Sequence, residues 1–555
     1  MSGRFTHWFR SGAPWIWLNA GAVAASLVMV LGLLLLIAVN GLGHFWAKSV
    51  WQFDYRQPDG SEVRLIGEIH DEEDISAARL RDAGGYVPEG HDGLITRYLV
   101  KTGNRDVSGL DFVWLAEPSI NDRRLPRDLV VFERREWGNF YGFLEAVKEN
   151  GSLIAGGGQA WPQLLQRLER VNRLHEEIVD LEKGEIGAIN YQLERLRLRQ
   201  RRLELDGEDS PQALARLDAE RKALQARFQN LRKELDARYQ ATRRDSVTMR
   251  LADGRRVEIP LASVVRAYRP NAMSLPAKIG FYAAKLWEFV SDDPREANTE
   301  GGIFPAIFGT VMMVMLMSIL VTPFGVIAAV YLREYAKQGP LTRLIRIAVN
   351  NLAGVPSIVY GVFGLGFFVY FLGGSIDQLF FPEALPAPTF GTPGLLWASL
   401  TLALLTVPVV IVATEEGLAR IPRSIREGSL ALGATKAETL WRTVLPMASP
   451  AMMTGLILAV ARAAGEVAPL MLVGVVKLAP SLPLDTNAPF LHLERKFMHL
   501  GFHIYDVGFQ SPNVEAARPL VYATALLLVG VIVTLNLAAI TIRNRLREKY
   551  RALEQ

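Results

Sequence analysis

The sequence predicts an α-helical, multi-pass membrane protein with six transmembrane helices and a large inserted α+β domain that carries an antiparallel coiled-coil hairpin. Half of the 555 residues are hydrophobic although 21% are charged, so the charged residues must be concentrated outside the apolar runs. Each apolar run approaches or exceeds the length of about 20 helical residues that crosses a bilayer. The six runs cover residues 18–39, 303–331, 347–372, 395–413, 447–476 and 519–542.

The spacing of these runs predicts how the chain is divided. The first run ends without a small-residue cleavage site, so we expect it to stay as an uncleaved anchor. The expected parts are a tail with the first transmembrane helix (1–40), an insert (41–300), a transmembrane core of five helices (301–541) with a loop at 415–446, and a basic tail (542–555). The sequence has no cysteine, so the insert must fold without disulfides.

Lysine and arginine predict on which side of the membrane each loop lies. They gather in the loops after the second and fourth runs and after the sixth run, whereas loop 373–393 has none and loop 478–517 has only Arg495 and Lys496. Short loops rich in these residues remain in the cytoplasm. We therefore expect both termini in the cytoplasm and the insert outside.

The insert combines two kinds of sequence pattern. Short segments rich in β-branched and aromatic residues predict a β-rich base, and Asp253-Gly254 lies between two alternating segments, as in a β-hairpin. Residues 161–245 instead carry apolar side chains at spacings of three and four, which is typical of an antiparallel coiled coil. Ser210 and Pro211 are placed to begin its second helix. Two interpretations stay open: a solvated arm without a partner, or a docking arm for a partner subunit or periplasmic protein.

Two charged residues interrupt the fifth apolar run. Arg462 and Glu466 are four residues apart, which places both on one face of a continuous helix. In a helix over residues 447–476, Arg462 lies about 20 Å from either end, near the bilayer midplane. A lone arginine there costs roughly 2.5–3.5 kcal/mol. One interpretation is a structural ion pair between spans. The other is an anion pathway, because the guanidinium fork matches the oxygens of an oxyanion and Glu466 can hold it when no anion is bound.

The loop before the fifth run has the order helix, glycine, helix, proline. We expect a short helix that starts at Glu427, a break at Gly433, a second helix over residues 434–442, and entry into the membrane at Leu445-Pro446. A short amphipathic helix held between two spans fits a groove on a cytoplasmic partner.

This loop resembles the EAA motif of the permease subunits of ABC importers, although Gly428, Ser429 and Val444 stand where the motif has two alanines and an isoleucine. Four stretches in the last five runs are similar to the PstA family of phosphate permeases. They are "TPFGVIAAVYLREY" (322–335), "GVPSIVYGVFG" (354–364), "VPVVIVATEEGLARIPRSIREGSLALGATK" (407–436) and "MTGLILAVARAAGEVAPLM" (453–471). The resemblance covers residues 301–541 and excludes the insert. Family members often carry an arginine in the fourth span, where this chain has Val412.

The resemblance implies the fold of a type I ABC importer permease and a transport function. The chain would be the subunit that carries inorganic phosphate across the bacterial inner membrane, with Arg462 and Glu466 in the substrate pathway and the insert in the periplasm. The coupling residues would be Glu427, Gly433, Ala434, Thr435, Leu445 and Pro446. The implied partners are a second homologous permease (PstC-like), two copies of an ATP-binding subunit (PstB-like), a periplasmic phosphate-binding protein (PstS-like) and membrane lipid.

The same reasoning predicts which chemistry the chain lacks. It contains no G-x-x-x-x-G-K-[ST] loop, so ATP and magnesium would be bound by the partner subunit and the chain is not expected to be an enzyme. We expect no cofactor, metal or nucleic acid on this chain. Two alternatives stay open: a permease for another oxyanion such as sulfate or phosphonate, and a membrane-anchored scaffold or sensor whose working part is the coiled coil.

Overall fold

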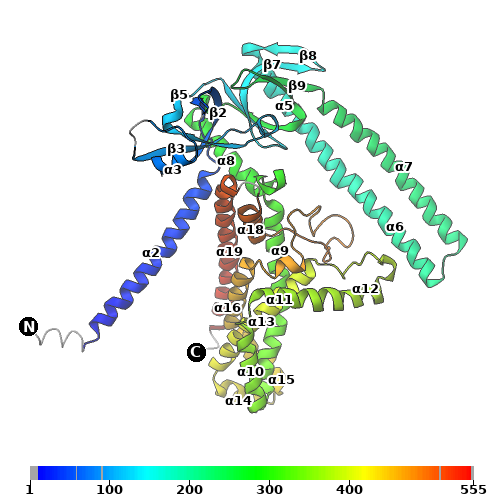
Figure 1. Cartoon of the computed structure of the whole chain (residues 1–555). Helices are drawn as coiled ribbons and strands as arrows, with labels where there is room; N and C mark the ends of the chain where they lie inside the picture. Colours follow the sequence, from blue (N-terminus) through cyan, green and yellow to red (C-terminus); the bar gives the residue numbers. More distant parts are fainter. Residues whose placement is uncertain (1–10, 58, 89–91, 512–513, 552–555) are drawn as a thin grey trace, which may run out of the picture.

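The computed structural model describes residues 11–57, 59–88, 92–511 and 514–551. A bundle of long helices forms one end of the molecule, two β-sheets lie at the other end, and a long helical hairpin runs from the sheets beside the bundle (Figure 1). Residues 1–10 of the expected N-terminal tail and residues 552–555 of the basic tail lie outside the described residues.

Six helical segments within the described ranges are long and apolar enough to cross a membrane, which confirms the number of runs predicted from the sequence. They are Pro14–Gly43, Phe304–Tyr335, Ser357–Phe380, Leu395–Arg420, Lys436–Gly465 and Ala517–Glu548. These segments correspond to α2 (Ala13–Gly43), α9 (Phe304–Val330), α11 (Ser357–Phe363) with α12 (Gly374–Phe380), α13 (Leu395–Arg420), α15 (Lys436–Thr439) with α16 (Leu445–Gly465), and α19 (Val514–Arg551).

The predicted bounds of the third run, residues 347–372, are wrong. Its first residues belong to a separate helix, α10 (Pro340–Leu352), and the third span begins only at Ser357 and extends to Phe380. Pro356 accounts for the gap, because the residue before a proline is disfavoured in the α-helical region and α10, which ends at Leu352, cannot continue through Val355.

Helix α13 lies at the centre of the bundle and packs between α9 and α16. Its side chains Leu395, Trp397 and Leu402 are almost fully buried. Close approach needs small residues: a β-carbon added at Gly325 of α9 would lie 2.6 Å from Val410 Cγ1 of α13, and Gly455 of α16 is as tightly packed against Ala413. Helix α2 instead diverges from the bundle, and its most apolar part is not buried in the molecule (Figure 1).

The segment between α2 and α9 contains two large antiparallel sheets and a two-stranded sheet of β12 (Pro294–Arg295) and β13 (Glu300–Gly301). The first sheet has the strand order β4-β3-β2-β1-β5, and the second has the order β10-β9-β7-β6-β11, with β8 paired to β7. The strands of the first sheet are β1 (Val50–Arg56), β2 (Glu62–Ser76), β3 (Leu94–Lys101), β4 (Phe112–Ala116) and β5 (Ile120–Arg124). Those of the second are β6 (Leu129–Arg134), β7 (Phe140–Glu149), β8 (Ser152–Gly156), β9 (Asp245–Arg250), β10 (Arg256–Pro260) and β11 (Val264–Tyr268). The hairpin expected at Asp253-Gly254 is confirmed, because Arg250 of β9 pairs with Arg256 of β10.

A long helical hairpin leaves the second sheet between β8 and β9. It consists of α5 (Ala160–Asp180), a π-helical turn (Leu181–Ile186), α6 (Gly187–Asp206) and the returning α7 (Pro211–Thr242). Ser210 caps α7 by accepting a hydrogen bond from the Ala213 amide at 3.3 Å, and Pro211 is the first helical residue, as predicted. Apolar contacts among Leu181, Ile189, Leu231 and their neighbours join the two arms.

The hairpin does not stand free of the bundle. The Tyr191 hydroxyl and the Arg195 guanidinium of α6 both donate hydrogen bonds to the Ala488 carbonyl, at 2.6 and 3.3 Å. The Tyr191 ring also meets His492 edge-on, with ring centroids 5.8 Å apart. The hairpin therefore contacts the long loop between the fifth and sixth spans.

A buried carboxylate anchors the base of the hairpin to the second sheet. Asp245 Oδ1 accepts a hydrogen bond from Arg167 at 2.9 Å, and Oδ2 accepts one from Arg170 at 2.7 Å, so the first residue of β9 is tied to α5. Burial raises the pKa of Asp245, but hydrogen bonds from Arg170 and Arg244 outweigh it and hold the pKa below its usual value. The charged form therefore stabilises the junction above the unfolded pKa of 3.8, and this contribution is lost as the pH falls through the lower folded pKa.

We predict that Asp245→Asn loosens the base of the hairpin. Hydrogen bonds to charged groups contribute about 1.5–3 kcal/mol each, so local opening and tryptic cleavage of residues 160–245 should increase by about ten- to a hundredfold at neutral pH. Mass spectrometry of a limited digest measures this rate. Asp253→Asn, in the exposed turn between β9 and β10, is the matched control and should leave the rate unchanged. Equal cleavage of both variants would contradict the proposed anchor.

Candidate functional site

The fifth span ends earlier than the sequence predicts. A single helix over residues 447–476 was expected, but the helical segment runs over Lys436–Gly465, and a separate short helix, α17, follows at Leu470–Val473. Glu466 has the extended dihedrals φ −79° and ψ 134°. Pro469 explains the break, because proline has no N–H for the Gly465 carbonyl and its ring clashes with a preceding helical turn.

This break changes the position of the charged pair. Arg462 lies in the last turn of α16, about 4.5 Å along the axis from the helix end, instead of about 20 Å from either end. The pair is nevertheless present: Arg462 Nε lies 3.6 Å from Glu466 Oε1. It forms across the helix end rather than along one helical face. The partial negative charge of a helix C-terminus favours a cation at this position.

The Arg462 guanidinium has one loose partner among the described residues. The contact with Glu466 is longer than a hydrogen bond, and no described residue accepts a hydrogen bond from the guanidinium. The side chain is 32% exposed, so it is not enclosed in dry packing. Its N–H donors are therefore free to bind an anion or water.

The helix end separates a packed side from an open side. Ala463 and Ala464 are fully buried in the bundle core together with Leu470. A β-carbon at Gly465, in contrast, would meet no atom within 4 Å. Arg462 thus lies at the boundary between the bundle core and the open side of the helix end.

Helix α11 supports the break from the other side. Gly361 packs so closely against Pro469 that a β-carbon there would lie 2.6 Å from the Pro469 Cα atom. One residue earlier, the Tyr360 hydroxyl donates a hydrogen bond to the Leu352 carbonyl at 2.6 Å. The third span therefore packs on the segment that directly follows the charged pair.

The fourth span forms an ion pair with an arginine of a neighbouring helix. Val412 is part of α13, and one turn later Glu415 pairs with Arg346 of α10 at 3.2 Å. Arg346 also donates hydrogen bonds to the Gln338 side chain and the Leu332 carbonyl. The sequence predicts only that Arg346 lies in a basic loop after the second apolar run. The signal that could have found the pair is the Glu415-Glu416 dipeptide at the end of an apolar run.

The loop between the fourth and fifth spans has the predicted order with shifted bounds. The first helix, α14, covers Arg423–Ala431 and does not start at Glu427, because Pro422 immediately precedes it and sets its beginning. The break at Gly433 is confirmed, since its φ of 89° is left-handed and suits glycine. Thr435 then forms a capping box with Glu438, so the second helix begins at Lys436 and not at Ala434.

The second helix of the loop continues into the span. Residues Leu440–Val444 are π-helical and lead into α16, which begins at Leu445. Pro446 accounts for this local change, because it cannot donate to the carbonyl four residues earlier. The helical segment from Lys436 to Gly465 therefore connects the loop with Arg462.

The loop is fixed to the end of the second span. Arg426 donates hydrogen bonds to the Ile421 and Leu418 carbonyls, at 2.7 and 2.8 Å, and to Glu334 at 2.9 Å. The outer surface of this loop carries both apolar and charged side chains: Leu432 is 91% exposed, Trp441 is 72% exposed, and Glu427 is also exposed. This surface has the character of a binding site for a partner protein.

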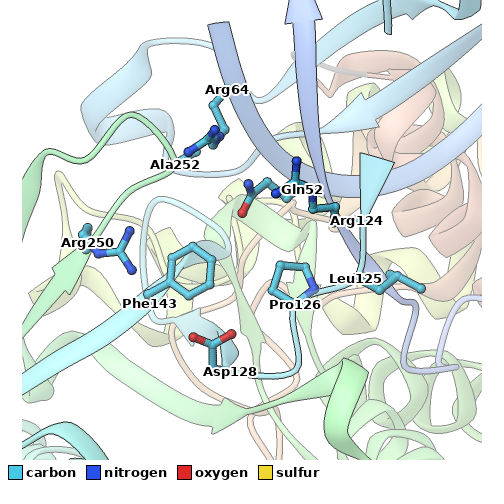
Figure 2. A pocket seen from close by; sticks show the side chains of 9 residues that line it. All are labelled: Gln52, Arg64, Arg124, Leu125, Pro126, Asp128, Phe143, Arg250 and Ala252. Carbon is cyan, nitrogen blue, oxygen red and sulfur yellow. The ribbon is translucent and has the colours of Figure 1, made fainter. Parts of the chain in front are cut away.

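Arginines elsewhere in the molecule show how the Arg462 site differs. A shallow pocket of about 440 Å³ beside the two sheets is lined by Arg64, Arg124 and Arg250, together with Asp128 and Phe143 (Figure 2). Each of these arginines already has a carboxylate partner: Asp54 at 2.7 Å, Asp122 at 2.6 Å and Glu145 at 3.2 Å, respectively. The pocket therefore offers less free positive charge to an anion than Arg462 does.

We predict that the open side of the helix end is accessible to water in the membrane. Because the chain has no cysteine, Gly465→Cys introduces a single thiol. In membrane vesicles it should react readily with the anionic, membrane-impermeant reagent methanethiosulfonate ethylsulfonate. Ala463→Cys, two residues earlier on the buried side, is the control and should react slowly. Slow labelling of both thiols would show that the site is closed to water.

Comparison with known proteins places the spans in one family. Residues 321–551 match the family described as the inner membrane component of binding-protein-dependent transport systems. The phosphate transport system permease protein PstA 1 of Mycobacterium tuberculosis (strain CDC 1551 / Oshkosh) is 36% identical over 244 residues, which cover 44% of this chain and 71% of that protein. PstA of Mycobacterium leprae (strain TN) is 36% identical over 206 residues, or 36% of this chain and 62% of that protein.

A relative from Methanocaldococcus jannaschii, the probable phosphate transport system permease protein PstA, is 32% identical over 189 residues, which cover 34% of this chain and 60% of that protein. With the six candidate membrane helices, these similarities account for the bundle and leave more than half of the chain outside the matched lengths. The chain belongs to the PstA-like permeases of ABC importers.

Proposed function

We propose that this chain is the permease subunit of an importer for inorganic phosphate, driven by a separate ATPase subunit. The observation that carries the proposal is the Arg462 guanidinium, a permanent cation within the bundle whose donors have no acceptor among the described residues. Support for phosphate as the cargo comes from the relatives, whose names describe phosphate transport.

The chemistry of the pair suits an oxyanion in transit. Arginine stays charged at all physiological pH values, and its planar fork can donate two hydrogen bonds to a phosphate. Glu466 lies 3.6 Å away, close enough to hold the guanidinium loosely between transport events. A weak internal partner is suitable here, because a substrate that passes through must be released again.

ATP-driven movement would reach the pair through the loop between the fourth and fifth spans. In this proposal the ATPase docks on α14 and the residues after it, where Glu427, Leu432 and Trp441 are exposed. Gly433, Ala434 and Thr435 form the hinge, and Leu445 and Pro446 lead into α16. The 30-residue helical segment that follows the hinge is about 45 Å long and ends one turn after Arg462. A displacement of the loop would thus move the charged pair, as alternating access requires.

The remaining assignments follow from the same proposal. The basic loops and tail would face the cytoplasm, and residues 41–300 would lie in the periplasm, within reach of a phosphate-binding protein. A second permease would complete the pore, and the divergence of α2 from the bundle leaves an apolar helix available for it or for lipid (Figure 1).

We predict that Arg462→Lys and Arg462→Gln lower phosphate uptake while the protein remains in the membrane. Hydrogen bonds to charged groups contribute about 1.5–3 kcal/mol, so uptake of radiolabelled phosphate in a deletion strain should fall by about ten- to a hundredfold. Arg545→Gln, on the exposed end of α19, is the matched control and should transport normally. Normal uptake by both Arg462 variants would rule out the pathway role. If the unmodified chain takes up sulfate instead of phosphate, the proposed cargo is wrong, but the proposed role of Arg462 in an anion pathway still stands.

A further inference from the structure

Helix α8 (Leu275–Ser291) turns its apolar face away from the rest of the protein. A helix on the surface of a water-soluble protein turns its apolar face inward. Its exposed positions hold no charged residue. They are Leu275, Pro276, Ala277, Ile279, Gly280, Ala283, Ala284 and Trp287. Leu275 is 64% exposed and Trp287 is 71% exposed, so these are large apolar side chains without cover in the molecule.

Two of the three charged residues of α8, Lys285 and Glu288, point inward and fix the rotation of the helix, while Lys278 is part-exposed. Lys285 Nζ lies 2.6 Å from Glu133 of β6, and Glu288 pairs with Arg266 of β11 at 3.0 Å and with Arg295 at 2.6 Å. Lys285 and Glu288 also line a cavity of about 360 Å³ between the first sheet and the bundle. Turning the apolar face inward would break all of these ion pairs, so the outward orientation of the apolar face is built into the fold.

Helix α8 lies where two membrane spans end. Its C-terminal part is hydrogen-bonded to the start of α9, through the Ile303 amide to the Phe289 carbonyl at 2.9 Å and the Phe304 amide to the Asp292 carbonyl at 3.1 Å. The Phe45 ring, two residues after the end of α2, packs on Phe289 with ring centroids 4.9 Å apart. In Figure 1, α8 lies between the sheets and the adjoining ends of α2 and α19. It therefore lies at the level where the apolar surface of the spans stops.

We propose that α8 is an interfacial helix whose apolar face rests in the phospholipid bilayer at the boundary between headgroups and acyl chains. The uncharged face continues the exposed apolar surface of α2, which extends to Val39 and Leu42. Trp46 and Trp287 at this level suit the membrane interface, where tryptophan is enriched. A protein interface carries a polar rim, whereas the exposed positions of α8 itself hold no charged residue, so lipid is the better match for this face. The lipid contact holds the two sheets at a fixed height above the membrane through the ion pairs of Lys285 and Glu288.

This proposal depends on the membrane location of the spans and not on the identity of the cargo. The absence of cysteine from the chain makes it testable with single labels. The variants Ala283→Cys and Ile279→Cys, both on the exposed face, carry a nitroxide in the full-length protein reconstituted into liposomes of phosphatidylethanolamine and phosphatidylglycerol. Electron paramagnetic resonance then compares the accessibility of each label to oxygen, which concentrates in the bilayer, and to a nickel chelate, which stays in water.

Two reference labels define the extremes. Val28→Cys lies on the exposed surface of α2, and Leu153→Cys lies on the exposed strand β8, and both native side chains are about as exposed as that of Trp287. We expect the labels at positions 283 and 279 to favour oxygen, as the label at 28 does, whereas the label at 153 favours the nickel chelate. Preference for nickel at 283 and 279 would overturn the proposal by placing α8 in water. Shielding from both reagents would also overturn it, in favour of a protein partner.

Discussion

The contact between Arg462 and Glu466 depends on the end of α16 at Gly465, and the organisation of the site follows from that helix end. A charged side chain within a membrane bundle is tolerated when it is ion-paired, hydrogen-bonded or accessible to water. Arg426 and Arg346 meet this condition by pairing, with Glu334 at 2.9 Å and Glu415 at 3.2 Å. Arg462 has a carboxylate at only 3.6 Å and lies beside Gly465, where the structure is open. These two cations are thus neutralised by close carboxylates, whereas Arg462 is held only loosely.

The same helical segment links this cation to the loop between the fourth and fifth spans. Gly433 and the capping box at Thr435 set where the helix begins, and Pro469 sets where it ends. Between them, π-helical hydrogen bonding at Leu440–Val444 accommodates Pro446 without interrupting the segment. Local backbone chemistry at a few prolines and glycines therefore decides that one continuous helical segment connects the loop with the charged pair.

Much of this architecture could be predicted from the sequence, because apolar runs of sufficient length have few alternatives to crossing the membrane as helices. The number of spans, the β9–β10 turn, the cap at Ser210 and the break at Gly433 all follow from local patterns. The helix ends at Leu352 and Gly465 were missed, since hydropathy does not distinguish a proline that bends a helix from one that ends it. The pairing of Arg346 with Glu415 was missed for another reason: it joins residues 69 positions apart, and only tertiary packing brings them together.

In the insert, too, contacts between residues far apart in the sequence could not be predicted from local patterns. Periodicity predicted a helical hairpin over residues 161–245. It could not predict the contact of Tyr191 with the Ala488 carbonyl, because these residues are 297 positions apart in the sequence. Likewise, the outward apolar face of α8 could be recognised only once the ion pairs of Lys285 and Glu288 showed which face is inside. Ion pairs thus constrain orientation in both halves of the molecule, through Lys285 and Glu288 in the insert and through Arg346 and Arg426 in the bundle.

An electron cryo-microscopy structure of the assembled importer, determined in lipid with phosphate present, tests the central claim most directly. The account predicts that the Arg462 guanidinium borders a continuous water-accessible conduit on the Gly465 side of α16, with density for an anion within hydrogen-bond distance in at least one state. A guanidinium that points toward acyl chains, or that is sealed in protein packing away from any conduit in every state, would contradict it.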